Sequence, residues 1–168
     1  MFDAPNIDLA ALVEPVQIVA GEAGRRILEV YASVFSVTEK ADQSPVTEAD
    51  LVAHGCILRG LAKLTPDIPV LSEEAPDVGF AERSRWGWLW LVDPLDGTRE
   101  FIKRSDQFSV NIALIHRHEV VFGLILLPVV GIYYHAYRGG GAHKQLVGTR
   151  ARRMQAARVC HNPVRVVS

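Results

Sequence analysis

The chain has 168 residues, of which 49% are hydrophobic and 22% are charged, and its formal net charge is −1. This composition is typical of one water-soluble domain with its own core, and the charge balance excludes a global basic field of the kind that attracts nucleic acid or acidic membranes. Two cysteines, Cys56 and Cys160, are too few for a disulfide framework or a zinc cluster.

An amphipathic helix is predicted near the N-terminus. Pro15 suits its first turn, and apolar residues then recur every three or four positions. The apolar face consists of Val16, Val19, Ala20, Ala23, Ile27, Val30 and Tyr31. Charged residues occupy the other side, namely Glu22, Arg25, Arg26 and Glu29. A polar loop over residues 39–44 follows.

A second helix is predicted over residues 47–64, and Pro66 stops it. Its buried stripe is expected to consist of Leu51, Leu58, Leu61 and Leu64. Thr47 is a good N-cap, and Asp50 stands three residues later, as in a capping box. A catalytic role is also open to Asp50, in which it and the Thr98 hydroxyl orient a water molecule at a metal site. The local sequence favours capping, and the two roles are compatible.

Acidic residues follow two short apolar segments. Residues 68–71 lead into the sequence SEE at 72–74, and residues 88–92 lead into DPLDGT at 93–98. Because both segments have the length of buried strands, each places its acids at a strand end. A single Asp-x-x-Asp is more often a solvated turn than a metal site, so it is the second acid-tipped strand that favours a metal site.

The Pro/Gly turn after the second segment favours convergence of oxygen atoms. Pro94 fixes one backbone angle, and Gly97 permits tight or positive-φ geometry. The carboxylates of Asp93 and Asp96 and the carbonyl of Leu95 can then face one point.

Glu73 joins this group as a third carboxylate if the two strands are neighbours. Like charges at ~5 Å repel by about 3 kcal/mol at an effective dielectric near 20, so such a cluster is stable only with a cation inside it. Hard cations such as Mg²⁺ prefer oxygen ligands of this kind.

The rest of the chain favours strands. The Pro-, Gly- and charge-rich residues 75–85 are predicted as a mobile surface loop in a position to cover the site. Strands are predicted over 108–115, 120–127 and 132–137, with short connections that favour antiparallel neighbours. A turn at 138–141, an arginine-rich loop at 149–158 and a last strand at 164–167 complete the chain. Two N-terminal helices packed on a mainly antiparallel sheet give an α+β fold.

Three motifs resemble the inositol-monophosphatase-like family of Mg²⁺-dependent, lithium-sensitive phosphatases. They are VTEAD at 46–50, LSEE at 71–74 and WLVDPLDGT at 90–98. Within this family, residues 64–74, 98–104 and 108–115 are most similar to the bacterial 3'(2'),5'-bisphosphate nucleotidases of the CysQ type. The resemblance runs over nearly the whole chain. It implies a phosphomonoester hydrolase that converts adenosine 3',5'-bisphosphate to AMP and phosphate and is linked to sulfate assimilation.

The resemblance also implies roles for individual residues. Two or three Mg²⁺ ions would be bound by Glu73, Asp93, the Leu95 carbonyl and Asp96, with Asp93 bridging two ions. The substrate would contact Glu73, Leu95, Asp96, Gly97 and Thr98. The catalytic residues would be Asp50, Thr98 and Glu73, the first two as the pair that activates the attacking water. Arg99, Lys103 and Arg104 are either contacts to a second phosphate or rim charges on a polar turn, and the sequence favours neither.

Members of this family are longer, and their second half carries a Trp-Asp motif that binds metal. No Trp-Asp pair occurs in this sequence, whose three tryptophans all precede Asp93. The resemblance therefore implies that residues 1–168 are the N-terminal metal-binding α+β domain of such an enzyme, without its C-terminal half. Two alternatives stay open. One is an inositol- or sugar-phosphate phosphatase on the same scaffold, and the other is a folded but inactive fragment that only binds metal or pairs with another chain.

The sequence also bears on location. The first residues have no basic region or apolar core of a signal peptide, and no apolar stretch reaches the roughly 18 residues that cross a membrane. We therefore expect a cytoplasmic protein, and the resemblance adds a peripheral position on the cytoplasmic face of the inner membrane as an alternative. The expected partner is a small nucleotide bisphosphate rather than nucleic acid, and the resemblance is compatible with an oligomer.

Overall fold

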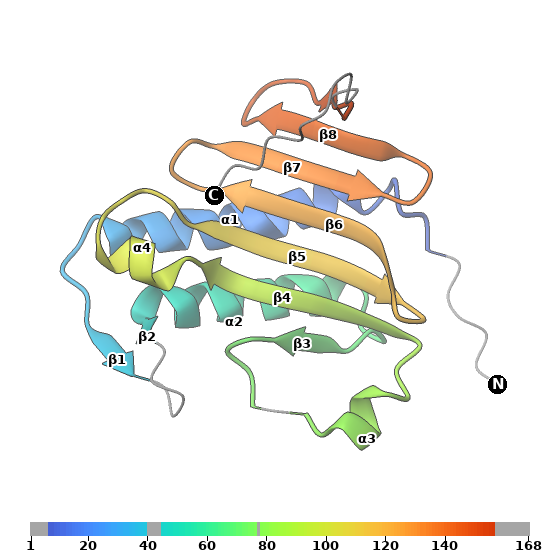
Figure 1. The fold of residues 1–168 in the computed structure, drawn as a ribbon, viewed down its shortest axis with the longest axis horizontal. Coiled ribbons are helices and arrows are strands. Elements are labelled where there is room, and N and C mark those ends of the chain that lie inside the picture. The colour runs from blue at the N-terminus through green and yellow to red at the C-terminus, as the bar shows by residue number, and fades with distance from the viewer. Residues whose placement is uncertain (1–6, 40–44, 77, 157–168) are drawn as a thin grey trace, which may run out of the picture.

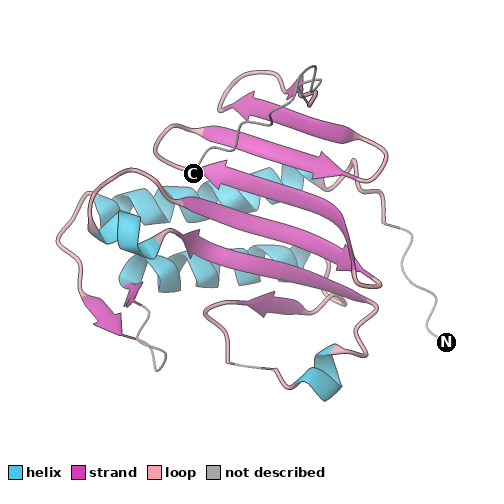
Figure 2. Cartoon of the chain, in the orientation of Figure 1, coloured by secondary structure: helices cyan, strands magenta, loops and turns pink. Residues whose placement is uncertain are grey.

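Two long helices lie side by side on one face of a seven-stranded sheet, and in the described part of the chain no helix lies on the other, uncovered face (Figures 1 and 2). The structure is a computed structural model that describes residues 7–39, 45–76 and 78–156. The helices are α1 (Val13–Tyr31) and α2 (Glu48–Leu64), and two short helices, α3 (Phe80–Arg83) and α4 (Thr98–Ile102), lie in connections. The predicted α+β class is confirmed.

The large sheet has the order β3-β4-β5-β6-β7-β8-β9. Its strands are β3 (Val70–Ser72), β4 (Trp88–Asp96), β5 (Ser109–His116), β6 (Glu119–Leu127), β7 (Ile132–Tyr137), β8 (Gly141–Leu146) and β9 (Arg152–Arg153). Strands β3 and β4 are parallel, and the later neighbours are antiparallel. A small hairpin of β1 (Val37–Glu39) and β2 (Pro45–Thr47) precedes α2.

The predicted apolar face of α1 is confirmed. Val16, Ala20, Ala23 and Ile27 are fully buried. The predicted charged face is also confirmed, since Arg25 and Arg26 form exposed ion pairs with Glu22 and Glu29 three or four positions away. Such exposed pairs contribute only about 0.3–0.5 kcal/mol each, so burial of the apolar face is what fixes α1.

The predicted buried stripe of α2 is partly wrong. Leu61 is buried, but Leu51 is 56% exposed. The buried face instead consists of Ala49, Asp50, Ala53, Ile57 and Leu61. Two of these five residues are alanines. Helix α1 comes close to α2 at Gly60, where a Cβ would lie 2.5 Å from Cγ2 of Val19. The pattern of large leucines therefore misidentified the face that packs.

Several connections differ from the sequence-based predictions. The expected loop at 75–85 contains α3, the expected loop at 39–44 begins with the last residue of β1, and the polar turn after residue 98 is the helix α4. Strand β8 was not predicted because residues 141–146 lack β-branched and aromatic residues, and its pairing with β7 stabilises it. The expected strand at 164–167 and most of the expected loop at 39–44 lie outside the described residues. None of the described helices combines the length and hydrophobicity of a membrane-crossing segment.

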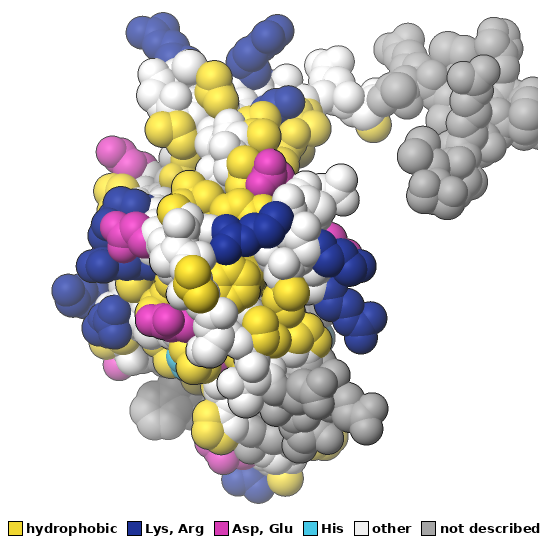
Figure 3. Space-filling model, turned by 90° about the vertical axis from the view of Figure 1, so that its left-hand side faces the viewer, with side chains coloured by type: hydrophobic (Ala, Val, Ile, Leu, Met, Phe, Trp, Pro, Cys, Tyr) yellow, Lys and Arg dark blue, Asp and Glu magenta, His cyan; other side chains and the backbone are white. Residues whose placement is uncertain are grey.

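The uncovered face of the sheet carries side chains of alternate strand positions. A groove of about 920 Å³ runs along it from Glu73 to Met154. Apolar residues form most of its lining, among them Leu71, Leu91, Ile125 and Ala136. The end of the molecule where β4 runs into α4 displays hydrophobic side chains among both basic and acidic ones (Figures 1 and 3).

Candidate active site

The carboxylate of Asp50 lies at the start of α2 and is 1% exposed. Its Oδ2 accepts hydrogen bonds from the backbone N–H and the hydroxyl of Thr47, both at 2.7 Å. Its Oδ1 accepts a hydrogen bond from the Thr98 hydroxyl at 3.1 Å. The predicted capping box is confirmed, and the same carboxylate also holds the first residue of α4.

Strand β4 does not end at Asp93, as the sequence suggested, but continues to Asp96 through a β-bulge. Pro94 and Leu95 together lie opposite one residue of β5 between the pairs made by the two acids. A bulge accommodates Pro94, which has no N–H for the ladder. The Leu95 N–H donates to Oδ1 of Asp93 at 3.2 Å, which fixes this carboxylate beside the bulge.

The turn that follows the bulge requires glycine. Gly97 has φ +93°, in the left-handed region, and a Cβ there would lie 2.7 Å from the carbonyl oxygen of Gln107. The turn leads directly into Thr98, whose hydroxyl also lies 3.2 Å from the Leu95 carbonyl oxygen. The predicted positive-φ role of Gly97 is confirmed.

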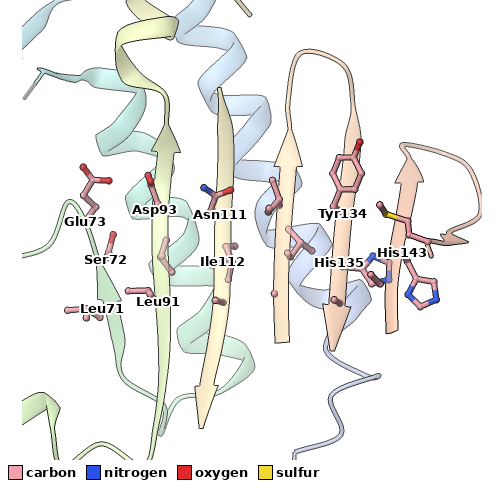
Figure 4. Close-up of a pocket in the computed structure, with 18 of the residues that line it drawn as sticks. Leu71, Ser72, Glu73, Leu91, Asp93, Asn111, Ile112, Tyr134, His135 and His143 are labelled. Carbon is pink, nitrogen blue, oxygen red and sulfur yellow. The ribbon is translucent and has the colours of Figure 1, made fainter. Parts of the chain in front are cut away.

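Glu73 and Asp93 occupy equivalent ends of two parallel neighbours. Ser72 pairs with Val92, so the next residue on each strand reaches the same edge of the sheet. The Glu73 N–H donates to the Val92 carbonyl at 3.1 Å, and Figure 4 shows the two carboxylates at this edge. Burial, with the charges of Glu73 and Asp96, raises the pKa of Asp93 from its ordinary 3.8 to about 7. The predicted proximity of the two acid-tipped strands is confirmed.

The third carboxylate has a partner on the next strand. Asp96 is exposed, and its Oδ2 accepts a hydrogen bond from Nδ2 of Asn111 at 3.1 Å. The Asn111 Oδ1 in turn accepts one from the Ser109 hydroxyl at 3.1 Å. Sequence reasoning did not select Asn111 as a site residue, although the alternation of β5 places it on the uncovered face beside the acids (Figure 4).

These residues match the donor chemistry of a hard divalent cation. Carboxylates of Glu73, Asp93 and Asp96 and the carbonyl of Leu95 are oxygen ligands of the kind that Mg²⁺ prefers. Within residues 7–39, 45–76 and 78–156, no three acidic, histidine or cysteine side chains form a ready-made metal cluster. Burial, followed by the charges of Glu73 and Asp96, raises the pKa of Asp93, and a cation would relieve the part that comes from these charges. The residues therefore fit the ion chemically, and their roles as ligands remain a prediction.

A further polar pair lies behind the acids. Nδ1 of His54, on α2, is 2.9 Å from the hydroxyl of Ser72, the residue before Glu73. Ser72 is buried, and burial lowers the pKa of His54 while the charge of Glu74 opposes that shift. Sequence reasoning missed this pair; the signal was the spacing of four between Asp50 and His54, which puts both on one helix face.

The three cations after the turn have different surroundings. The Arg104 guanidinium lies over the rings of Tyr31 and Phe35, at 4.7 and 4.9 Å from their centroids, and donates to the Ser33 carbonyl at 2.8 Å. These contacts hold it against the end of α1. Arg99 and Lys103 are exposed on α4 and just after it. Arg104 thus has a structural contact that neither of the two roles left open includes, and the choice between those roles stays a prediction for Arg99 and Lys103.

The sequence and fold were compared with known proteins. The model of the inositol monophosphatase family matches residues 8–163. The chain belongs to this family. It is 49% identical over 141 residues to the 3'(2'),5'-bisphosphate nucleotidase CysQ of Escherichia coli O157:H7, covering 83% of this chain and 56% of that protein.

Solved structures of the inositol monophosphatase family share the fold. CysQ from Bacteroides thetaiotaomicron is 39% identical, with a TM-score of 0.75 over 90% of this chain and 60% of its own. The extragenic suppressor protein SuhB from Bartonella henselae is 30% identical, with a TM-score of 0.74 over 88% of this chain and 56% of its own. The chain spans about half the length of the curated relatives that it matches.

Proposed function

We propose that this chain carries the N-terminal, metal-binding part of a Mg²⁺-dependent phosphomonoester hydrolase that converts adenosine 3',5'-bisphosphate to AMP and phosphate. The identity of 49% to a bisphosphate nucleotidase over 83% of this chain is the observation that carries the proposal. The proposal includes residues 1–168 as one α+β domain and a cytoplasmic role in sulfate assimilation.

The acidic edge of the sheet is the proposed site of two or three Mg²⁺ ions. The proposed ligands are the carboxylates of Glu73, Asp93 and Asp96 and the carbonyl of Leu95, with Asp93 shared between ions. When bound, Mg²⁺ polarises phosphoryl oxygens and lowers the pKa of water. The pKa of about 7 at Asp93 supports this assignment, because a nearby cation stabilises the charged form of a carboxylate that burial and neighbouring acids disfavour.

Thr98 and Asp50 are the proposed pair that activates the attacking water. Asp50 is buried and already accepts from Thr47 with one oxygen, so it reaches the reaction only through Thr98. When the Thr98 hydroxyl donates a hydrogen bond to Oδ1 of Asp50, a lone pair of its oxygen is free to accept a hydrogen bond from water. If the water gives its proton to Thr98, the Thr98 proton passes to Asp50. Asp50 thereby fixes the orientation of that lone pair.

The substrate would lie beside this pair. The turn formed by Leu95, Asp96, Gly97 and Thr98 is the proposed contact for the phosphate that is cleaved, and Glu73 approaches it from β3. A bisphosphate needs further cationic contacts for its second phosphate. Arg99 and Lys103 are the candidates, since both are exposed on the segment that follows Thr98. Arg104 is not included in this proposal, because its guanidinium already contacts Tyr31 and Phe35.

One assay tests the proposal. The purified chain is given adenosine 3',5'-bisphosphate with Mg²⁺, with and without Li⁺, and inositol monophosphate in parallel. Phosphate release from the nucleotide, dependent on Mg²⁺ and inhibited by Li⁺, is the expected result. Release from inositol monophosphate alone supports the alternative phosphatase on the same scaffold. No release from either substrate, while the chain binds Mn²⁺ as a substitute for Mg²⁺, supports an inactive metal-binding fragment.

A further inference from the structure

Two side chains of helix α2 contact two different segments of the acidic edge, the end of the sheet where Glu73, Asp93 and Asp96 lie. Asp50 accepts from Thr98, which follows the bulge of β4, and His54 is hydrogen-bonded to Ser72, the last residue of β3. Residues four apart lie on one face of a helix, about one turn from each other. A single rigid helix therefore contacts both segments that carry acids.

Strand β3 needs such support. It is an edge strand of three residues, and among the described residues it pairs with β4 alone. Directly after it, Glu73 stands level with Asp93 of β4, because Ser72 pairs with Val92. Repulsion between the two carboxylates acts to separate the end of β3 from β4, and a three-residue strand supplies few hydrogen bonds against it.

We propose that His54 is a positioning residue, which through Ser72 fixes Glu73 at the distance from Asp93 that binding of a divalent cation requires. This inference rests on the proposed function in one respect, namely that Glu73 is a metal ligand. His54 itself touches neither metal nor substrate.

The burial of Ser72 makes its hydrogen bond with His54 important for the position of Glu73. Ser72 is 6% exposed, and its hydroxyl lies 2.9 Å from Nδ1 of His54. Loss of the imidazole leaves a buried hydroxyl without this partner, which favours movement of Ser72 toward water. The movement is passed on through the peptide that joins Ser72 to Glu73 and through the Ala75 N–H, which donates to the Ser72 carbonyl at 3.1 Å. It acts against the hydrogen bond from the Glu73 N–H to the Val92 carbonyl, also 3.1 Å long. The displacement therefore reaches Glu73 directly.

The test uses two variants that break the contact and one that retains it. His54→Ala and Ser72→Ala remove one partner each. His54→Asn places an amide group close to the position of Nδ1 and keeps the hydrogen bond without an imidazole. His118→Asn is the matched control, because His118 is an exposed histidine in the turn between β5 and β6.

Two readouts apply to all variants: amide hydrogen exchange of the peptide covering residues 70–75, and the dissociation constant for Mn²⁺. We expect His54→Ala and Ser72→Ala to speed exchange in this peptide and to weaken Mn²⁺ binding about fivefold, the equivalent of one hydrogen bond. We expect His54→Asn and His118→Asn to match the wild type, and the double variant His54→Ala/Ser72→Ala to be no weaker than either single variant.

The outcomes separate the two proposals. Unchanged exchange in residues 70–75 of His54→Ala, or exchange that rises equally throughout the chain, overturns the positioning role. Faster exchange without weaker Mn²⁺ binding also overturns it. If the wild type binds no Mn²⁺, the proposed metal site is wrong. The exchange data alone then decide whether His54 holds Glu73 in place.

Discussion

Asp50 and Thr98 are 48 residues apart and are joined by a hydrogen bond of 3.1 Å between the Thr98 hydroxyl and the Asp50 carboxylate. The same carboxylate caps α2 through Thr47. One side chain thus has a structural role and a proposed catalytic one, and these roles can be separated by substitution.

Replacement of Asp50 by Asn tests that separation. The amide keeps an oxygen that can accept from Thr47 but removes the charge that orients the Thr98 hydroxyl. We expect phosphate release to fall at least ~100-fold, the usual contribution of a positioned acid–base group, and stability to fall by about 1–2 kcal/mol. Thr47→Ala is the control, with a similar loss of stability and activity within about threefold of the wild type. Equal activities of the two variants would contradict the catalytic role.

The stability of the metal-free protein is expected to fall as the pH rises from about 4 to about 7. The folded pKa of Asp93 is about 7, against 3.8 for the free group, so in this window the folded state binds the proton that the unfolded state has released. Solvent screening of a half-buried side chain reduces the effect to roughly 2 kcal/mol.

Urea unfolding at several pH values measures this dependence. Asp93→Asn should flatten the curve in this window and raise the stability of the metal-free protein at pH 8. Added Mg²⁺ should restore stability to the wild type at pH 8 and leave Asp93→Asn nearly unchanged. A wild type that becomes more stable between pH 4 and 7 would show that the sign is wrong.

Gly97→Ala should be more harmful than the same change at Gly139. Both glycines have positive φ, +93° and +85°, but a Cβ at Gly97 would lie 2.7 Å from a backbone oxygen, whereas nothing lies within 4 Å at Gly139. We expect a loss of about 1 kcal/mol at Gly139 from the backbone conformation alone, and at least about 3 kcal/mol at Gly97. Chemical unfolding measures both. Equal losses would mean that the turn can move away from Gln107.

Arg104 and Arg99 are expected to affect different quantities. Arg104→Ala removes two aromatic contacts and a hydrogen bond to Ser33, which should cost about 1–2 kcal/mol of stability with the KM for the nucleotide unchanged. Arg99→Ala should leave stability within about 0.5 kcal/mol of the wild type and raise the KM severalfold. Unfolding curves and initial rates distinguish the two, and a raised KM for Arg104→Ala would return it to the substrate site.

Local pattern was sufficient for the elements whose own residues determine them. The face of α1, the cap of α2 and the central strands β5 to β7 follow from periodicity and from Thr47 and Asp50. Local pattern was insufficient where contacts with a neighbouring helix or strand determine which residues are buried or paired. Ala53 is buried although it is smaller than the exposed Leu51, and β8 is stabilised by its pairing with β7.

The candidate site shows the same division. Glu73, Asp93 and Asp96 were selected because acids at strand ends are visible in a sequence. The side chains that hold them were not: Asn111 reaches Asp96 from the adjacent strand, and His54 reaches Ser72 from a helix. Such contacts depend on the packing of α2 and on the register of β5, which the sequence pattern does not specify.

The parallel pairing of β3 with β4 has a consequence for how this protein family can vary. A parallel neighbour must be reached by a chain that returns along the full length of the strand, here residues 73–87 with α3. The alignment of Glu73 with Asp93 is fixed by the strand register and not by the length of this return, so residues can be added or lost around α3 without misaligning the acids. Changes in this segment can therefore alter the rim of the groove while the positions of Glu73 and Asp93 stay the same.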